Sequence, residues 1–133
     1  MTGINLNPDG PHSSDHTAEL GALFDACSRA IVYATMAGKG GVAYPSGVYR
    51  LVADIYSATA RLPQMCGQME EFLRVQATTG RLYEARGRDV KIQCARGMAH
   101  LAQAAAAAGA LTMALQAAQT DIAGLGVKEG TDG

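Results

Sequence analysis

Three cysteines and one histidine, Cys27, Cys66, Cys94 and His100, are the residues best suited to bind a metal. Thiolate and imidazole groups are the usual zinc ligands, but zinc sites typically draw them from closely spaced pairs such as C-x-x-C. The sequence contains no such pair, and the step from Cys94 to His100 does not return to one helix face. Each cysteine is in phase with neighbouring apolar residues, where a thiol packs as a small hydrophobic group. We therefore expect no metal site and no cofactor.

Patterns that would indicate catalysis or nucleotide binding are incomplete. Residues 38–41, Gly-Lys-Gly-Gly, lack the Gly-Lys-Ser/Thr step of a phosphate-binding loop, so they are better explained as a turn between helices. Glu70 and Glu71 are adjacent and point to different sides of a helix, which prevents them from acting as a carboxylate pair. The chain has no G-x-S-x-G or H-E-x-x-H motif. The sequence predicts a protein without catalytic residues, which is not an enzyme.

Positive charge is concentrated in one part of the chain. Residues 74–96 contain six Arg or Lys and two acidic residues, whereas the whole protein has a net charge of −1. Basic side chains near an aromatic ring such as Tyr83 could contact the phosphates and bases of a nucleic acid. A solvated connection between two helices, in which the arginines maintain solubility, explains the same pattern. The candidate nucleic-acid contacts are Arg81, Arg86, Arg88, Lys91 and Arg96.

A long helix is predicted in the middle of the chain. From Val48 to residue 76, apolar residues recur at steps of three and four, which places them along one helix face. We expect this helix over 45–79, ended by Gly80. Pro63 removes one backbone hydrogen bond, but the apolar phase continues through it, so the helix is predicted to be kinked there rather than divided in two.

Two further helices are predicted on either side. The first runs from Ser14 or Asp15, either of which can cap free backbone N–H groups, to the breaker at Gly38. The third runs from Asp89, as a cap or first-turn acid, to about Ala123. Polar, glycine-rich and proline-rich ends predict a disordered arm over 1–14 and a disordered tail over 124–133, with a single domain over 15–123.

The third predicted helix is unusually uncharged. Residues 97–120 contain no Asp, Glu, Lys or Arg, and residues 104–108 are all alanine. Such a length could cross a membrane. However, His100 and Gln103 lie inside it, and alanine contributes little to membrane insertion. We therefore expect a buried bundle helix, and no contact with a membrane.

The predicted fold is all-α: an antiparallel bundle of three helices, two of them long. Alanine allows a neighbouring backbone to approach closely, so the large side chains of the 45–79 helix should pack against the alanines of the 89–123 helix. One shorter helix cannot cover the remaining apolar surface, which predicts a homodimer or higher oligomer. The expected interface residues are Ile55, Leu62, Met69, Leu101, Ala105, Ala108 and Leu115.

The start of the chain has no basic segment followed by an apolar run, so a secretory signal is not expected. An odd count of three cysteines agrees with reduced thiols. Both observations predict a cytoplasmic protein.

Two short motifs carry a resemblance to a known group. They are Tyr-Pro-Ser-Gly-Val-Tyr at 44–49 and Arg-Leu-Pro-Gln-Met at 61–65, followed by an Ala-rich last helix. The chain thereby resembles small Ala-rich helical proteins of actinomycetes that are associated with plasmids or integrated elements, over about residues 33–122. The resemblance implies a cytosolic accessory role in a high-GC bacterium, and brings no activity, cofactor or site residue with it.

Two functions therefore stay open. The first is a non-enzymatic interaction or assembly protein, which uses helix faces to bind itself and an unidentified protein partner. The second is a small nucleic-acid-associated regulator, which uses the basic residues over 81–96.

Overall fold

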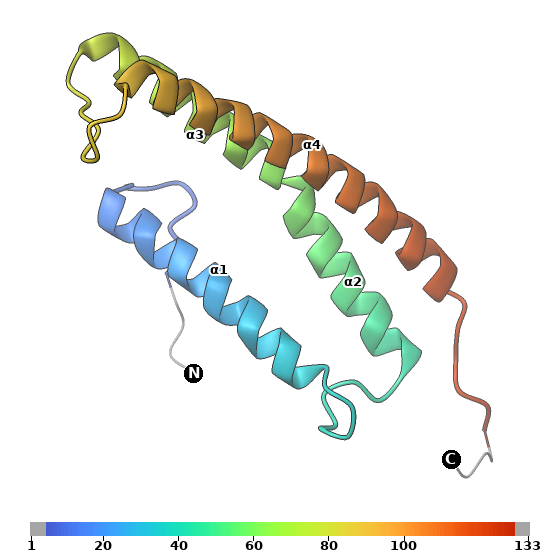
Figure 1. Ribbon diagram of the computed structural model, residues 1–133. Coiled ribbons are helices and arrows are strands. Elements are labelled where there is room, and N and C mark those ends of the chain that lie inside the picture. Colours follow the sequence, from blue (N-terminus) through green and yellow to red (C-terminus); the bar gives the residue numbers. More distant parts are fainter. Residues whose placement is uncertain (1–4, 130–133) are drawn as a thin grey trace. The chain divides into compact units, whose positions relative to one another are not determined.

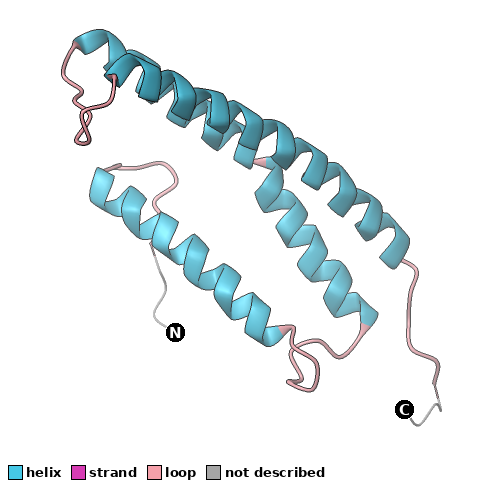
Figure 2. Cartoon of the chain, viewed as in Figure 1, coloured by secondary structure: helices cyan, strands magenta, loops and turns pink. Residues whose placement is uncertain are grey.

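The computed structural model describes residues 5–129, which form four α-helices and, within that range, no β-strand (Figure 1). The helices are α1 (Ser14–Ala34), α2 (Pro45–Ala60), α3 (Leu62–Thr79) and α4 (Val90–Ile122). The predicted all-α class is thus confirmed, as Figure 2 shows. The outer ends of the predicted arm and tail, 1–4 and 130–133, lie outside the described residues.

The chain divides into two compact units, residues 1–43 and 44–133. The first unit holds α1, and the second holds α2, α3 and α4. Within residues 5–43, the described part of the first unit, no second helix covers the apolar side chains of α1. The predicted three-helix bundle and its oligomerisation remain predictions.

Helix α1 begins at Ser14, as predicted, but its cap is Ser13 and not Ser14 or Asp15. The Ser13 hydroxyl oxygen accepts a hydrogen bond from the His16 backbone N–H at 3.1 Å and caps the helix. The helix ends at Ala34, four residues before the predicted end at Gly38. Gly41 passes close to this end of the helix, because a Cβ there would collide with the carbonyl group of Ala34. The glycine cluster is therefore the turn that closes over the end of the helix.

Helices α2 and α3 correspond to the predicted kinked helix. They are separated by one residue, Arg61, whose backbone stays in the right-handed helical region at φ −88° and ψ −14°. The interruption lies two residues before Pro63, because the proline disfavours helical geometry just ahead of it and has no N–H to continue the ladder. The Arg61 N–H bonds to the Ala58 carbonyl, and the Met65 N–H to the Arg61 carbonyl, both at 3.1 Å.

The connection between α3 and α4 contains both predicted boundary residues, one at the end of α3 and one at the start of α4. Gly80 ends α3 in the left-handed conformation at φ +72°, which a side chain would strain. The Asp89 carboxylate accepts a hydrogen bond from the Ile92 N–H at 3.0 Å and caps α4. From there α4 runs without interruption for 33 residues.

Both α2 and α3 pack against α4, so the second unit is a long helical hairpin (Figure 1). The Thr112 hydroxyl on α4 lies 3.0 Å from the Thr59 hydroxyl on α2, whereas Leu101, earlier in α4, lies beside Met69 and Phe72 on α3. Since the residue numbers run in opposite directions, the pairing is antiparallel. The predicted pairing of the two long helical segments is confirmed.

The hairpin buries small side chains. Among the described residues, Thr59, Cys66 and Ala108 are buried, with 8%, 7% and 6% of their surface exposed. All three lie near the α2–α3 interruption. We use the term seam for the contact between α2–α3 and α4 that contains them. Small side chains at the seam allow the backbones to approach closely.

Candidate interaction surface on the helical hairpin

One side of α3 exposes large apolar side chains beside the seam. Met65, Met69 and Phe72 are 40%, 49% and 62% exposed. Their spacing of four and three residues aligns them along one side of the helix. We call this side the apolar flank. Cys66 and Leu73, each one position further along the chain than a flank residue, are buried and half-buried instead.

The other side of α3 is polar. Gln64, Glu71 and Thr78 are exposed, and Arg74 forms an ion pair with Glu71. The Thr78 hydroxyl donates to the Val75 carbonyl at 2.7 Å. The helix therefore presents a seam side, a polar side for water and an apolar flank. The flank is a third, separate surface, which α4 does not cover and whose apolar side chains are exposed to water.

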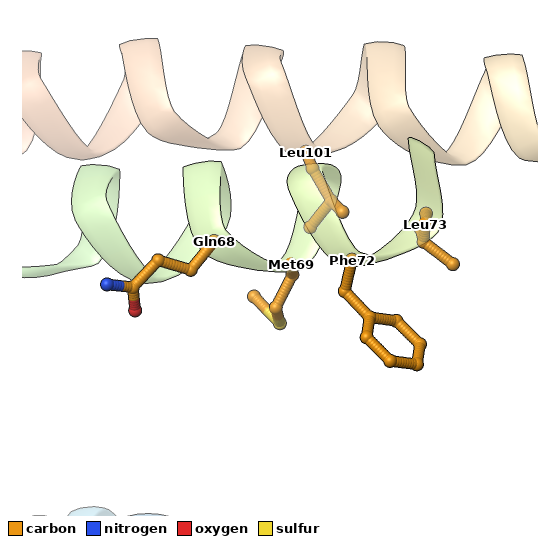
Figure 3. Close-up of a pocket in the computed structure, with 5 residues that line it drawn as sticks. All are labelled: Gln68, Met69, Phe72, Leu73 and Leu101. Carbon is orange, nitrogen blue, oxygen red and sulfur yellow. The ribbon is translucent and has the colours of Figure 1, made fainter. Parts of the chain in front are cut away.

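A shallow groove runs between the apolar flank and α4 (Figure 3). In Figure 3 the side chains of Met69 and Phe72 project away from α4. The groove volume is about 430 Å³, and its lining consists of Gln68, Met69, Phe72, Leu73 and Leu101. Methionine is unbranched and adapts its shape to a partner, so a lining of this kind suits contact with another helix.

The edge of α4 continues this surface. Ala104 and Leu111, spaced in helical phase with Leu101, are exposed, Leu111 to 47%. The outward side of α4 holds exposed alanines together with Met113, which is 72% exposed. Like the rest of 97–120, it carries no charge.

Helix α4 is also long and apolar enough, by length and composition, to cross a membrane, and is the one such helix found in the described part of the chain. The mean hydropathy of its most apolar window is only 1.3. The amide and imidazole groups of Gln103 and His100 would lie inside the span. These polar groups oppose insertion of α4 into a membrane, although much of the apolar surface of the helix is exposed.

The predicted interface residues fall into two groups. Met69 lies on the apolar flank. The others belong to the seam within one chain: Ala108 is buried, and the half-buried members are Ile55, Leu62, Leu101, Ala105 and Leu115. The sequence analysis placed all apolar residues of 48–76 on one helix face, and it therefore did not separate Met65 and Phe72 from their neighbours Cys66 and Leu73. Consecutive apolar residues, as at 65–66 and 72–73, widen an apolar stripe beyond what one partner helix covers. This pattern in the sequence could have indicated the flank.

The loop between α3 and α4 is organised by Glu84. Its carboxylate lies 2.9 Å from the Arg88 guanidinium and accepts the backbone N–H groups of Arg86 at 2.8 Å and Arg88 at 3.2 Å. The side chain is only 11% exposed. Burial acts to raise the pKa of Glu84, but these hydrogen bonds and the Arg88 charge outweigh it and hold the pKa below its ordinary value. Arg88 is therefore engaged within the loop.

Two of the other candidate nucleic-acid contacts point to different sides of α4. Arg81, Arg86, Lys91 and Arg96 are all exposed. Lys91 and Arg96 are both on α4, but five positions in a helix with 3.6 residues per turn separate them by about 140°. A phosphate backbone that contacts one of these two side chains would not reach the other from the same side.

The residues considered for zinc are likewise not brought together. Cys27 is exposed on α1 in the first unit, whereas Cys66 is buried and Cys94 half-buried in the second. Over residues 5–129, no group of three His, Cys, Asp or Glu side chains is placed to hold a metal ion.

Comparison of the chain with protein-family models, with curated proteins and with solved structures finds no match in any of the three. The apolar flank, the groove and the charge-free surface of α4 are therefore the features that indicate a function.

Proposed function

We propose that this protein is a non-enzymatic assembly protein, which acts through self-association and through helix-face contacts with a protein partner. The observation that carries the proposal is the apolar flank. Phe72 is 62% exposed there, beside a helix whose neighbouring surface has no charge to keep it hydrated. Contiguous apolar surface of this kind usually marks an interaction site in a soluble protein.

The energetics of the hairpin support the same proposal. Thr59, Cys66 and Ala108 are its buried residues within the described range, and small side chains contribute little burial energy each. Covering the larger flank side chains removes more apolar surface from water, at about 25 cal/mol per Å² before the costs of association. A copy of the chain that binds there stabilises the folded hairpin by mass action.

The test is the mass of the intact protein in solution. Size-exclusion chromatography with light scattering, run from low to high micromolar concentration, is expected to show a mass that rises from one copy to two or more. A single-copy mass over the whole range contradicts self-association. Circular dichroism on the same samples verifies that the chain is helical.

The second candidate function, a nucleic-acid-associated regulator, is supported by the exposure of Arg81 and Arg86 at the α3–α4 loop. It predicts binding to DNA or RNA with a steep dependence on salt, because displaced counterions drive such binding. Replacing Arg81, Arg86 and Arg88 by Ala should then flatten that dependence. Absence of binding at low salt removes this candidate and leaves self-association untouched.

A cytoplasmic accessory role, as expected from the resemblance to actinomycete proteins, belongs to the same proposal. The competing location is a membrane crossed by α4. Recovery of the protein in the soluble fraction of lysed cells supports the cytoplasm, whereas resistance to alkaline carbonate extraction supports the membrane.

A further inference from the structure

We propose that the occupant of the apolar flank is the same flank of a second copy, in antiparallel orientation, with a two-fold axis beside Met69. This inference rests on the proposed self-association and specifies its geometry. In a two-fold contact, each residue pair occurs twice, so the surface must be complementary to itself. Three features of the flank meet this requirement.

The first feature is the order of residues along the flank. Arg61, Met65, Met69, Phe72 and Gln76 follow one another at steps of four, four, three and four, so they form one line. The line has polar ends and an apolar centre. When two such lines run antiparallel about Met69, Met65 of each copy meets Phe72 of the other. Contacts between a thioether and an aromatic ring are favourable, and here they would form twice.

The second feature is charge. Arg61 is exposed at one end of the line, where its guanidinium donates to the Ser57 carbonyl at 3.2 Å with one of its N–H groups, and Gln76 is half-buried at the other. A parallel arrangement would bring the two Arg61 guanidinium groups together, which is unfavourable for like charges. The antiparallel arrangement places Arg61 beside Gln76 of the second copy, whose amide oxygen can accept a hydrogen bond from it. The flank between these ends carries no charge, so two copies do not repel each other at the centre.

The third feature is area. From exposures of 40%, 49% and 62%, Met65, Met69 and Phe72 together leave roughly 300 Å² of side-chain surface open, whereas each partner in a stable complex contributes roughly 800 Å². The contact must therefore extend past α3. The exposed edge of α4 at Ala104 and Leu111 supplies additional apolar surface, which a second hairpin can reach and a single peptide helix would cover only in part.

Cysteine cross-linking tests this geometry. In a Cys27→Ser background, which removes the exposed native thiol, Met69→Cys is expected to form a disulfide between copies under mild oxidation, because a residue beside the axis meets its own counterpart. Met65→Cys and Phe72→Cys should cross-link poorly when each is oxidised alone, and efficiently when the two are mixed. Gln64→Cys, exposed on the polar side of α3, is the matched control and should not cross-link. The Cys27→Ser protein measures any background from Cys66 and Cys94.

The outcomes separate the geometry from the proposed function. If light scattering shows a dimer but Met69→Cys and the mixed pair do not cross-link above background, the antiparallel flank contact is wrong and self-association stands. If Met65→Cys and Phe72→Cys each cross-link efficiently alone, the copies are parallel. If every variant and the parent protein are monomeric, the proposed function fails together with its geometry. Circular dichroism of the reduced variants confirms that the exposed substitutions preserve the helices.

Discussion

The seam and the apolar flank lie side by side on α3, but the seam buries small side chains whereas the flank exposes large apolar ones. The seam buries Thr59, Cys66 and Ala108, all of them small, whereas the flank leaves Met69 and Phe72 about half exposed or more. A single helical hairpin would gain more from the reverse arrangement, because burial energy grows with the area removed from water. The seam therefore joins the helices through small side chains, whereas the larger Met69 and Phe72 project away from α4 (Figure 3).

The largest expected effect comes from enlarging a side chain at the seam. Ala108→Leu adds volume at a buried position of the seam, and we expect it to lower the free energy of unfolding by about 1–3 kcal/mol. Thermal unfolding followed by circular dichroism measures the change. The control is Ala106→Leu, which lies on the exposed side of the same helix and should change stability by no more than about 0.5 kcal/mol. Equal effects at both positions would show that the seam is not closely packed.

The next effect concerns the flank. Phe72→Glu places a charge where we expect a second copy, so the dissociation constant of the dimer should rise at least about tenfold, equivalent to about 1.4 kcal/mol. The helical content should remain unchanged, because Phe72 is already exposed. Light scattering over a concentration series reports the shift. Gln64→Glu introduces the same charge on the polar side of α3 and should leave the dimer intact; similar loss from both variants would mean that charge alone, and not position, weakens association.

A smaller effect is expected from the hydrogen bond that crosses the seam. The Thr112 hydroxyl lies 3.0 Å from Thr59 Oγ1 and 2.8 Å from the Ala108 carbonyl. Thr59→Val removes the contact between hydroxyl groups and should reduce the free energy of unfolding in urea by about 1 kcal/mol. Because Thr112 then keeps the Ala108 carbonyl as its acceptor, adding Thr112→Val should cost less than it does alone. Fully additive losses would show that the two hydroxyl groups do not interact.

The smallest effect is local to the α3–α4 loop, away from both surfaces. The pKa of Glu84 is lowered by folding, so its carboxylate stabilises the loop fully above its unfolded pKa, and this contribution is lost as pH falls through the lower folded pKa. We expect the amide resonances of Arg86 and Arg88 to shift on acidification below the ordinary value of 4.5. Glu84→Gln should abolish that titration. Unchanged resonances in the native protein would contradict the proposed role of Glu84, while leaving seam and flank unaffected.

Much of the backbone could be predicted from residues whose effects are local. Asp89 caps α4 through a hydrogen bond to a residue three positions away, and Gly80 supplies the left-handed end of α3, both as predicted. The cap of α1 is Ser13, one residue before the predicted Ser14. Pro63 marks the α2–α3 interruption because its missing N–H acts within one turn. The end of α1 was predicted four residues late, at the glycine cluster, and the close approach of Gly41 to the Ala34 carbonyl involves backbone atoms that no side-chain pattern reveals.

The candidate site was harder to predict, for a physical reason. Periodicity places Met65 with Cys66 and Phe72 with Leu73, but consecutive residues are about 100° apart on a helix. Which member of each pair faces α4 depends on the rotation of α3 about its axis. That rotation depends on how closely the small residues at Cys66 and Ala108 allow the helices to approach. It can therefore be known only from the structure of the paired helices.

The interruption at Arg61 has a mechanical consequence. On one side of the hairpin the regular helical hydrogen bonding is interrupted at Arg61, while on the other side α4 continues past this point for several turns in both directions. We therefore expect the α2–α3 segment to bend mainly at Arg61. The uninterrupted α4 packs against both shorter helices and restrains this bending. We therefore expect a load applied to the outer end of α2 to be transmitted to the α3–α4 loop mainly through α4.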